Sequence, residues 1–216
     1  MLLAGTRLTV LLTIVSMSLA LVLGLALALL RGSRLLPVRL AAAAYVDFVR
    51  STPLILQLFY IYFVLPFVGL RLPALVAGVA GLSLNYSAYI SEVYRSAIGS
   101  VDPGQREAAA VLGLRELAIM RRVILPQALR FAVPPLGNYL VSMFKDTALV
   151  ATISVEELLF SAENLASETY RYLDVFTLTF GIYFLISYPG VLLVRYLERA
   201  LARGRSPTKL ASTARP

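Results

Sequence analysis

The chain has 216 residues, of which 59% are hydrophobic and 15% charged, and its formal net charge is +8. This composition excludes an ordinary soluble domain and makes the lipid bilayer the expected solvent. The sequence holds no cysteine and no histidine, so it excludes disulfides, thiolate metal sites and histidine proton shuttles. We assign the basic balance to membrane topology and anionic lipid rather than to nucleic acid, because no aromatic-basic platform is present.

Five segments approach the roughly 20 apolar residues that a helix needs to cross the hydrocarbon core. The first is too long for the core of a secretion signal, so we expect it to be retained. The second is short, and the fourth contains the charged pair Lys145 and Asp146. In chain order, the predicted spans are residues 8–30, 53–68, 73–93, 131–153 and 175–194.

The distribution of bases predicts the orientation, since Lys and Arg are retained on the cytoplasmic side. They gather between spans one and two, between spans three and four and after span five, whereas the connection between spans four and five is acidic. We therefore expect a multi-pass protein of the plasma or inner membrane with its N-terminus outside and its C-terminus cytoplasmic. Residues 1–203 are predicted to form one transmembrane domain, and residues 204–216 a mobile cytoplasmic tail.

Two charged pairs lie near the ends of predicted spans. Asp47 and Arg50 precede span two, and Glu92 and Arg95 close span three at a spacing that lets them meet on a helix. A charge at the bilayer centre costs ~2.5 to 3.5 kcal/mol on insertion scales unless it is paired or faces a cavity. Interfacial ion pairs are the simpler interpretation for both, and a part in transport stays open for the first.

Between spans three and four, residues 102–126 form a polar segment that predicts two short helices joined by a hinge. Asp102 can cap a helix that starts at Pro103. Gly113 offers the backbone a left-handed exit. The second helix is expected to stop at Pro126, because the residue before a proline avoids helical angles.

This segment resembles the cytoplasmic coupling loop of permease subunits in ATP-binding-cassette (ABC) importers. The resemblance rests on Glu-Ala-Ala at 107–109, the glycine at the sixth place beyond that Glu, and the Val-Ile-Leu-Pro ending at 123–126, where Ile is usual in place of Val123. Further matches to the polar amino acid permeases extend it over nearly the whole chain, and a weaker likeness points to the ectoine and hydroxyectoine branch. These further matches are residues 50–54, 125–128, 134–138 and 145–149.

The resemblance implies an all-α integral membrane protein with about five transmembrane helices and a coupling-helix loop, the type I importer permease fold. No phosphate-binding loop occurs in the sequence, so this chain is expected to be a transport subunit rather than an enzyme. The implied partners are a dimer of ATPase subunits, an extracytoplasmic solute-binding protein and a second permease subunit, identical or related. ATP and Mg would be bound by the ATPase, with no cofactor in this chain.

The resemblance also suggests residue roles. In the coupling loop, Glu107 would be the polar anchor, Ala108 and Ala109 would allow close approach to the ATPase, Gly113 would be the hinge and Pro126 the end. The candidate solute-binding residues are Asn85, Tyr89, Asp146, Thr147, Ser154 and Glu157.

Glu157 is the sharpest of these candidates, because its carboxylate could meet a positive nitrogen of the solute. The alternative is a solvated acidic rim at the outer face. Lys145 and Asp146 are equally well explained as a structural pair within the bundle.

The expected function is the import of a polar amino acid or an amino-acid-derived zwitterion such as ectoine, driven by the separate ATPase. One alternative is a self-sufficient ion-coupled carrier or channel, against which the loop at 102–126 argues. An intramembrane enzyme is disfavoured, because His, Cys and a Gly-x-Ser-x-Gly sequence are all missing. A subunit that only scaffolds a heterodimer, while its partner holds the solute, stays open.

Overall fold

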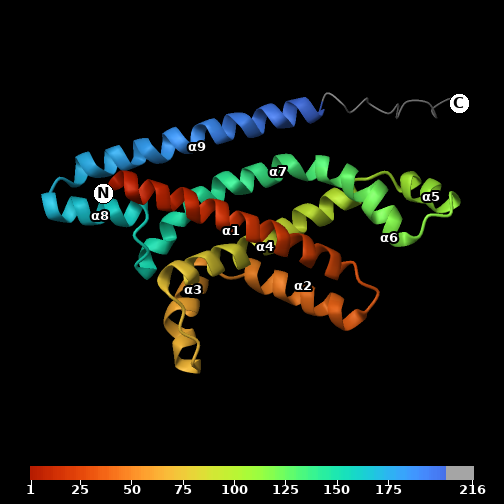
Figure 1. Cartoon of the computed structure of the whole chain (residues 1–216), viewed down its shortest axis with the longest axis horizontal. Coiled ribbons are helices and arrows are strands. Elements are labelled where there is room, and N and C mark those ends of the chain that lie inside the picture. The colour runs from red at the N-terminus through yellow and green to blue at the C-terminus, as the bar shows by residue number, and fades with distance from the viewer. Residues whose placement is uncertain (203–216) are drawn as a thin grey trace, which may run out of the picture.

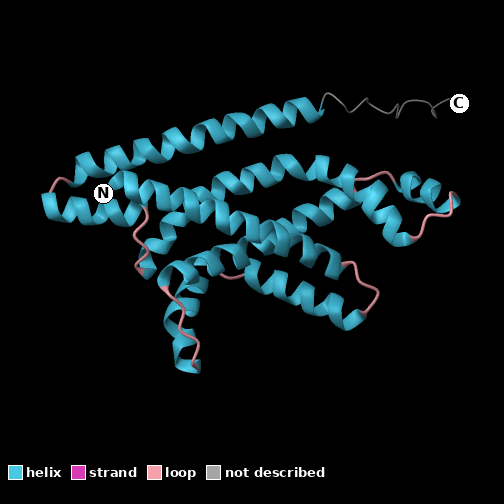
Figure 2. Ribbon diagram, in the orientation of Figure 1, coloured by secondary structure: helices cyan, strands magenta, loops and turns pink. Residues whose placement is uncertain are grey.

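The computed structural model describes residues 1–202, and every regular element in this range is a helix (Figure 2). The all-helical class predicted from the sequence is confirmed. The α-helices are α1 (Leu2–Arg31), α2 (Leu36–Arg50), α3 (Leu54–Phe59), α4 (Ala74–Gly99), α5 (Pro103–Val111), α6 (Glu116–Ile119), α7 (Leu125–Asp146), α8 (Leu158–Thr169) and α9 (Tyr172–Ala202). Short π-helical turns η1 (Tyr60–Val64) and η3 (Met120–Ile124) and 3-10 turns η2 (Leu65–Val68) and η4 (Thr147–Ile153) join them.

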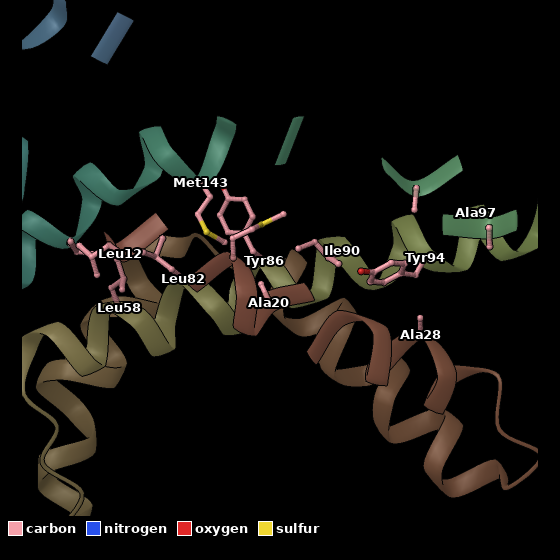
Figure 3. Packing of buried hydrophobic residues seen from close by; sticks show 14 of the residues in the cluster. Leu12, Ala20, Ala28, Leu58, Leu82, Tyr86, Ile90, Tyr94, Ala97 and Met143 are labelled. Carbon is pink, nitrogen blue, oxygen red and sulfur yellow. The ribbon is translucent and has the colours of Figure 1, made fainter. Parts of the chain in front are cut away.

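The core is built around α4, which packs most extensively against α1. Small residues allow the two helices to approach closely: a Cβ added at Gly24 would lie 2.6 Å from Cγ2 of Ile90. Figure 3 shows the side chains of α1 and α4 in this layer, with Leu58 of α3 and Met143 of α7 packed against them. Such packing suits a membrane protein, where van der Waals contact between small residues holds helices together.

By length and composition, α1, α4 and α9 are long and apolar enough to cross a membrane. Helix α2 and residues 54–68 pass the same test only as a pair, bent by 107° at the break between them. The described residues therefore hold three such helices, or four if the bent pair is one span, where the sequence predicted five.

The second predicted span is not a straight helix. Pro53 takes an extended ψ of 137°, so α3 begins in a new direction after α2 ends at Arg50. The segment then widens into the π-helical turn η1, tightens into the 3-10 turn η2 and projects from the bundle in Figure 1. Because of this bend, the segment does not form the single straight span that hydropathy predicted. Hydropathy contains no information on backbone direction.

The fourth predicted span is divided. Helix α7 ends at Asp146, and η4 continues to Ile153 before Ser154 adopts a left-handed φ of 65°. Helix α7 is not among the helices that meet the length and hydropathy requirement in the described range. Its 22 residues include two internal prolines, Pro134 and Pro135, and the charged pair at its end.

The segments predicted to be cytoplasmic lie at one end of the molecule. In Figure 1, the turn between α1 and α2, the α5–α6 loop and the last turns of α9 share that end. The N-terminus, α8 and the start of α9 lie at the other. The predicted orientation requires this separation. The predicted tail, 204–216, lies outside the described residues, as does the last position of the predicted domain.

Candidate solute pocket and coupling loop

A polar pocket of about 470 Å³ lies where the break between α2 and α3 meets α4 and α7. Its size falls within the range of about 300–1,000 Å³ that is typical of small-molecule sites. It is lined by Arg50, Ser51, Thr52, Pro53, Leu54, Asn85, Tyr86, Tyr89, Tyr139, Ser142 and Asp146.

Helix α7 presents Tyr139 and Asp146 to this pocket, and the structure fixes both against α4. The hydroxyl of Tyr86 donates to Oδ2 of Asp146 at 2.6 Å. The ring of Tyr139 lies 6.1 Å from that of Tyr86, edge to face, and 5.9 Å from that of Tyr89. The pocket thus combines one oriented carboxylate with three aromatic rings, a combination that suits a positively charged nitrogen.

Gln57 ties the helix break to α4. Its Nε2 donates to the carbonyl oxygens of Val49 (2.9 Å) and Thr52 (3.2 Å) and to Oγ1 of Thr52 (2.8 Å). Its Oε1 accepts a hydrogen bond from Nδ2 of Asn85 at 3.2 Å. One amide therefore satisfies carbonyls at the end of α2, which have no helical partner, and orients the Asn85 amide in the pocket.

Arg50 enters the pocket from the end of α2. Its guanidinium carbon lies 5.6 Å from the ring centroid of Tyr89, and its Nη1 lies 3.5 Å from Oε1 of Glu92. The pair of Arg50 with Asp47 suggested by sequence spacing is not among the ion pairs of residues 1–202. Glu92 on α4 takes that place, because the bundle brings the end of α2 beside α4.

The loop between α4 and α7 has the predicted helix–hinge–helix form. The Oδ1 of Asp102 accepts from the amide of Gly104 at 2.7 Å, and Pro103 opens α5. Gly113 has a φ of +75°, which a glycine adopts without strain. An ion pair between Arg106 and Glu116 then fastens α5 to α6.

One predicted end of this loop is wrong. Pro126 does not stop a helix but lies in the first turn of α7, preceded by the helical angles of Leu125. Proline has no amide to donate, and the amide just before it, that of Leu125, bonds to the carbonyl of Met120 in the π-helical turn η3. The preceding π-helical turn, η3, carries the chain from α6 into α7 without a break.

The tip of the loop is apolar and exposed. Val111, Leu112 and Leu117 are 88%, 80% and 70% exposed. Glu107 and Ala108 are also exposed, but Ala109 is buried in the core of the same chain. The small-residue surface predicted at 108 and 109 is therefore reduced to Ala108, because helical periodicity turns Ala109 inward.

Residues 7–203 match the family described as the inner membrane component of binding-protein-dependent transport systems. The chain belongs to this family. The probable amino-acid ABC transporter permease protein y4tG of Sinorhizobium fredii is 41% identical over 209 residues, covering 97% of this chain and 90% of that protein. The probable glutamine ABC transporter permease protein GlnM of Bacillus subtilis is 35% identical over 195 residues, covering 90% of each. The crystal structure of an amino acid ABC transporter with histidines shares 38% identity and a TM-score of 0.86, covering 92% of this chain and 93% of that one.

The permease is thus a multi-pass inner-membrane component of a binding-protein-dependent ABC importer with the type I importer fold. Of its six candidate solute-binding residues, Asn85, Tyr89 and Asp146 line the pocket. Thr147 does not, because its fully buried hydroxyl donates to the carbonyl of Phe144. Ser154 is exposed at the left-handed end of η4, away from the pocket lining.

Glu157 in the permease fits neither interpretation offered by the sequence. Its side chain is fully buried, so it is not part of a solvated rim, and it is not among the residues that line the pocket. Its Oε1 accepts from the amide of Phe160 at 2.9 Å and caps α8. Its Oε2 accepts from the hydroxyls of Tyr183 (2.9 Å) and Thr9 (3.1 Å). Glu157 therefore joins α1, α8 and α9.

Sequence reasoning missed several residues of the permease pocket. Helical spacing carries a signal for some of them: Tyr139, Ser142 and Asp146 stand at i, i+3 and i+7, and so share one face of α7. Tyr86 neighbours the predicted Asn85 on α4. No local pattern points to the part played by Gln57, since its partners lie on α2 and α4.

Proposed function

We propose that the permease carries a polar amino acid, or an amino-acid-derived zwitterion such as ectoine, through the pocket between the helix break, α4 and α7. The observation that carries this proposal is the carboxylate of Asp146, held by Tyr86 at the edge of a cavity of about 470 Å³. The positive nitrogen of an amino acid fits such a carboxylate flanked by aromatic rings. The relatives named for amino acid and glutamine transport support the same solute class.

The driving force is proposed to come from a separate dimer of ATPase subunits that binds and hydrolyses ATP with Mg. The exposed apolar tip of the α5–α6 loop, with Glu107 beside it, would contact the ATPase, since large exposed apolar groups outside the bilayer mark interaction surfaces. Gly113 supplies the hinge of that loop. A solute-binding protein would deliver the solute from outside, where the N-terminus is proposed to lie.

A second permease subunit, identical or related, is proposed to complete the route. Helix α9 supports this, because only 11% of its apolar membrane-spanning stretch is buried within the chain. Lipid or another subunit must cover the rest of that surface. ATP-driven closure of the ATPase would then move the coupling loops and rock the two permease subunits between outward and inward openings.

The test uses the importer complex, with its ATPase and binding protein, reconstituted in lipid vesicles. ATPase stimulation is measured across polar amino acids and ectoine. We expect Asp146→Asn to abolish stimulation by the solute while basal ATP hydrolysis persists, because the variant loses the charge that faces the positive nitrogen.

Lys145→Gln is the matched control, since Lys145 is the exposed neighbour on α7 and does not line the pocket. Normal stimulation in Asp146→Asn would overturn the pocket assignment. Uptake that continues without the ATPase would instead favour a self-sufficient carrier.

A further inference from the structure

A single carboxylate at the end of the bundle holds three arginines from three helices. Glu92 on α4 accepts through Oε1 from Nη1 of Arg31 on α1, and through Oε2 from Nε and Nη2 of Arg95 at 2.9 and 2.6 Å. Nη1 of Arg50 on α2 lies 3.5 Å from the same Oε1. Three positive charges thus face one negative charge, so the cluster retains an excess of positive charge.

Arg50 is held more loosely than the other two arginines, and it alone of the three lines the solute pocket. Its contact with Glu92 is the longest of the ion pairs in the cluster. A guanidinium has five N–H donors in a fixed plane. The contact with Glu92 involves one nitrogen, Nη1, and leaves further donors available to a molecule in the pocket.

The guanidinium of Arg50 is nevertheless oriented. Glu92 holds one edge, and the ring of Tyr89 lies under it at 5.6 Å from the guanidinium carbon to the ring centroid. A planar cation fixed at its edge and its face loses little rotational freedom when it binds a second carboxylate. Two-pronged binding of a carboxylate is the geometry for which arginine is best suited.

We propose that Arg50 recognises the carboxylate of the transported solute, and that Glu92 is the positioning residue that holds Arg50 in the pocket. The inference rests on the proposed function and extends it. The solute must carry a carboxylate as well as a positive nitrogen, with the carboxylate toward Arg50 and the nitrogen toward Asp146. The break between α2 and α3 is what lets a charge from the end of one helix enter a pocket formed by two others.

The experiment compares solutes with and without a carboxylate. The probes are L-histidine with histamine, and L-arginine with agmatine, since each second compound lacks only the carboxylate of the first. Binding is measured by titration calorimetry on the purified permease–ATPase complex without the solute-binding protein, so that the binding protein does not select the ligand. In the wild type, we expect at least one amino acid to bind roughly tenfold or more tightly than its decarboxylated analogue.

Arg50→Gln should reduce this preference to less than about twofold by weakening binding of the amino acid, while binding of the cationic amine is not weakened, because the variant removes a positive charge from the pocket. Arg95→Gln is the matched control. It removes the same charge from the same carboxylate, but Arg95 does not line the pocket, so the preference should persist. Arg50→Lys keeps the charge without the planar fork and should retain part of the preference.

Glu92→Gln should also reduce the preference for the amino acid over the amine, but less strongly than Arg50→Gln does. Glu92→Asp keeps the carboxylate and should retain part of that preference. Binding of histamine or agmatine that is no weaker in Arg50→Gln than in the wild type shows that the pocket is intact, which a general folding defect would not allow.

Three outcomes overturn the inference. Equal binding of amino acid and amine in the wild type, or a preference that survives Arg50→Gln, contradicts it while the pocket stands. Loss of the preference in Arg95→Gln to the same degree would assign the effect to the charge of the cluster, including attraction of anionic lipid. Absence of saturable binding of all four probes, and of glutamine and ectoine titrated beside them, contradicts the proposed function itself, as does a failure of Asp146→Asn to weaken any binding that is seen.

Discussion

Glu157 is a buried carboxylate whose surroundings explain why it is tolerated. A charge removed from water is costly unless hydrogen bonds replace its hydration. Glu157 receives them from one backbone amide and two hydroxyls, contributed by α8, α9 and α1. The approach of α1 is close: a Cβ added at Gly5 would lie 2.5 Å from Oγ of Ser161 and 2.8 Å from the carbonyl oxygen of Glu157. Glu157 and Gly5 together hold α1 against α8 and α9.

We predict that Glu157→Gln destabilises the permease by about 1–3 kcal/mol. The NH2 group that replaces one carboxylate oxygen cannot accept a hydrogen bond, so either the two hydroxyls or the backbone amide of α8 lose their acceptor. Thermal unfolding in detergent measures the loss. Glu156→Gln is the control, since Glu156 is the exposed neighbour. If Glu157→Gln unfolds as the wild type does but loses transport, Glu157 belongs to the solute route after all.

At the scale of elements, the break between α2 and α3 determines the pocket. Thr52 and Pro53 line it there, and Gln57 bridges from the end of α2 to Asn85 on α4. Without this bridge the Val49 carbonyl and the Asn85 amide both lose a partner. The bend of 107° is therefore held by a side chain rather than by backbone geometry alone.

Gln57→Ala is expected to weaken binding of the solute roughly tenfold, on the assumption that about one hydrogen bond to the pocket is lost. Gln57→Glu keeps an acceptor for Asn85 but faces the α2 carbonyls with a negative charge, so it should be worse. Leu56→Ala, at the exposed neighbouring position, controls for a general effect on α3. If Gln57→Ala binds the solute as tightly as the wild type does, the Gln57 bridge is not needed to form the pocket.

The α5–α6 loop is a second element with a separable task. We predict that Leu112→Asp and Glu107→Lys each weaken attachment of the ATPase, since one places a charge on the exposed apolar tip and the other reverses the charge beside it. Co-purification of the ATPase from membranes measures this. Leu173→Asp is the control, because Leu173 is 81% exposed near the start of α9, at the opposite end of the molecule (Figure 1). Full co-purification in both loop variants would contradict the coupling assignment.

For the whole molecule, the separation of two ends allows a test of orientation. The sequence has no cysteine, so single cysteines at the exposed positions Ser100 and Ser167 report without background. Ser161, near the start of α8, is unsuitable because it is buried. An impermeant thiol reagent applied to intact cells should label position 167 and spare position 100. The reverse pattern would invert the topology and place the α5–α6 loop outside.

The sequence by itself determined the features that depend on neighbouring residues. The apolar composition fixed the membrane helical class. Asp102, Pro103 and Gly113 fixed the start and the hinge of the α5–α6 loop, because a cap, a first-turn proline and a left-handed glycine act within a few residues of themselves. The prediction that a helix ends at Pro126 is wrong, because the π-helical turn before this proline leads directly into α7.

Only the tertiary structure decided which polar groups meet. The hydroxyl of Tyr86 and the carboxylate of Asp146 are 60 positions apart, and Thr9 and Glu157 are 148 apart. Helix periodicity limits each side chain to a face but leaves open which face of another helix lies opposite. The bend between α2 and α3 and the close crossing of α1 with α8 settle that choice, so Asp146 reaches the pocket while Glu157 is enclosed.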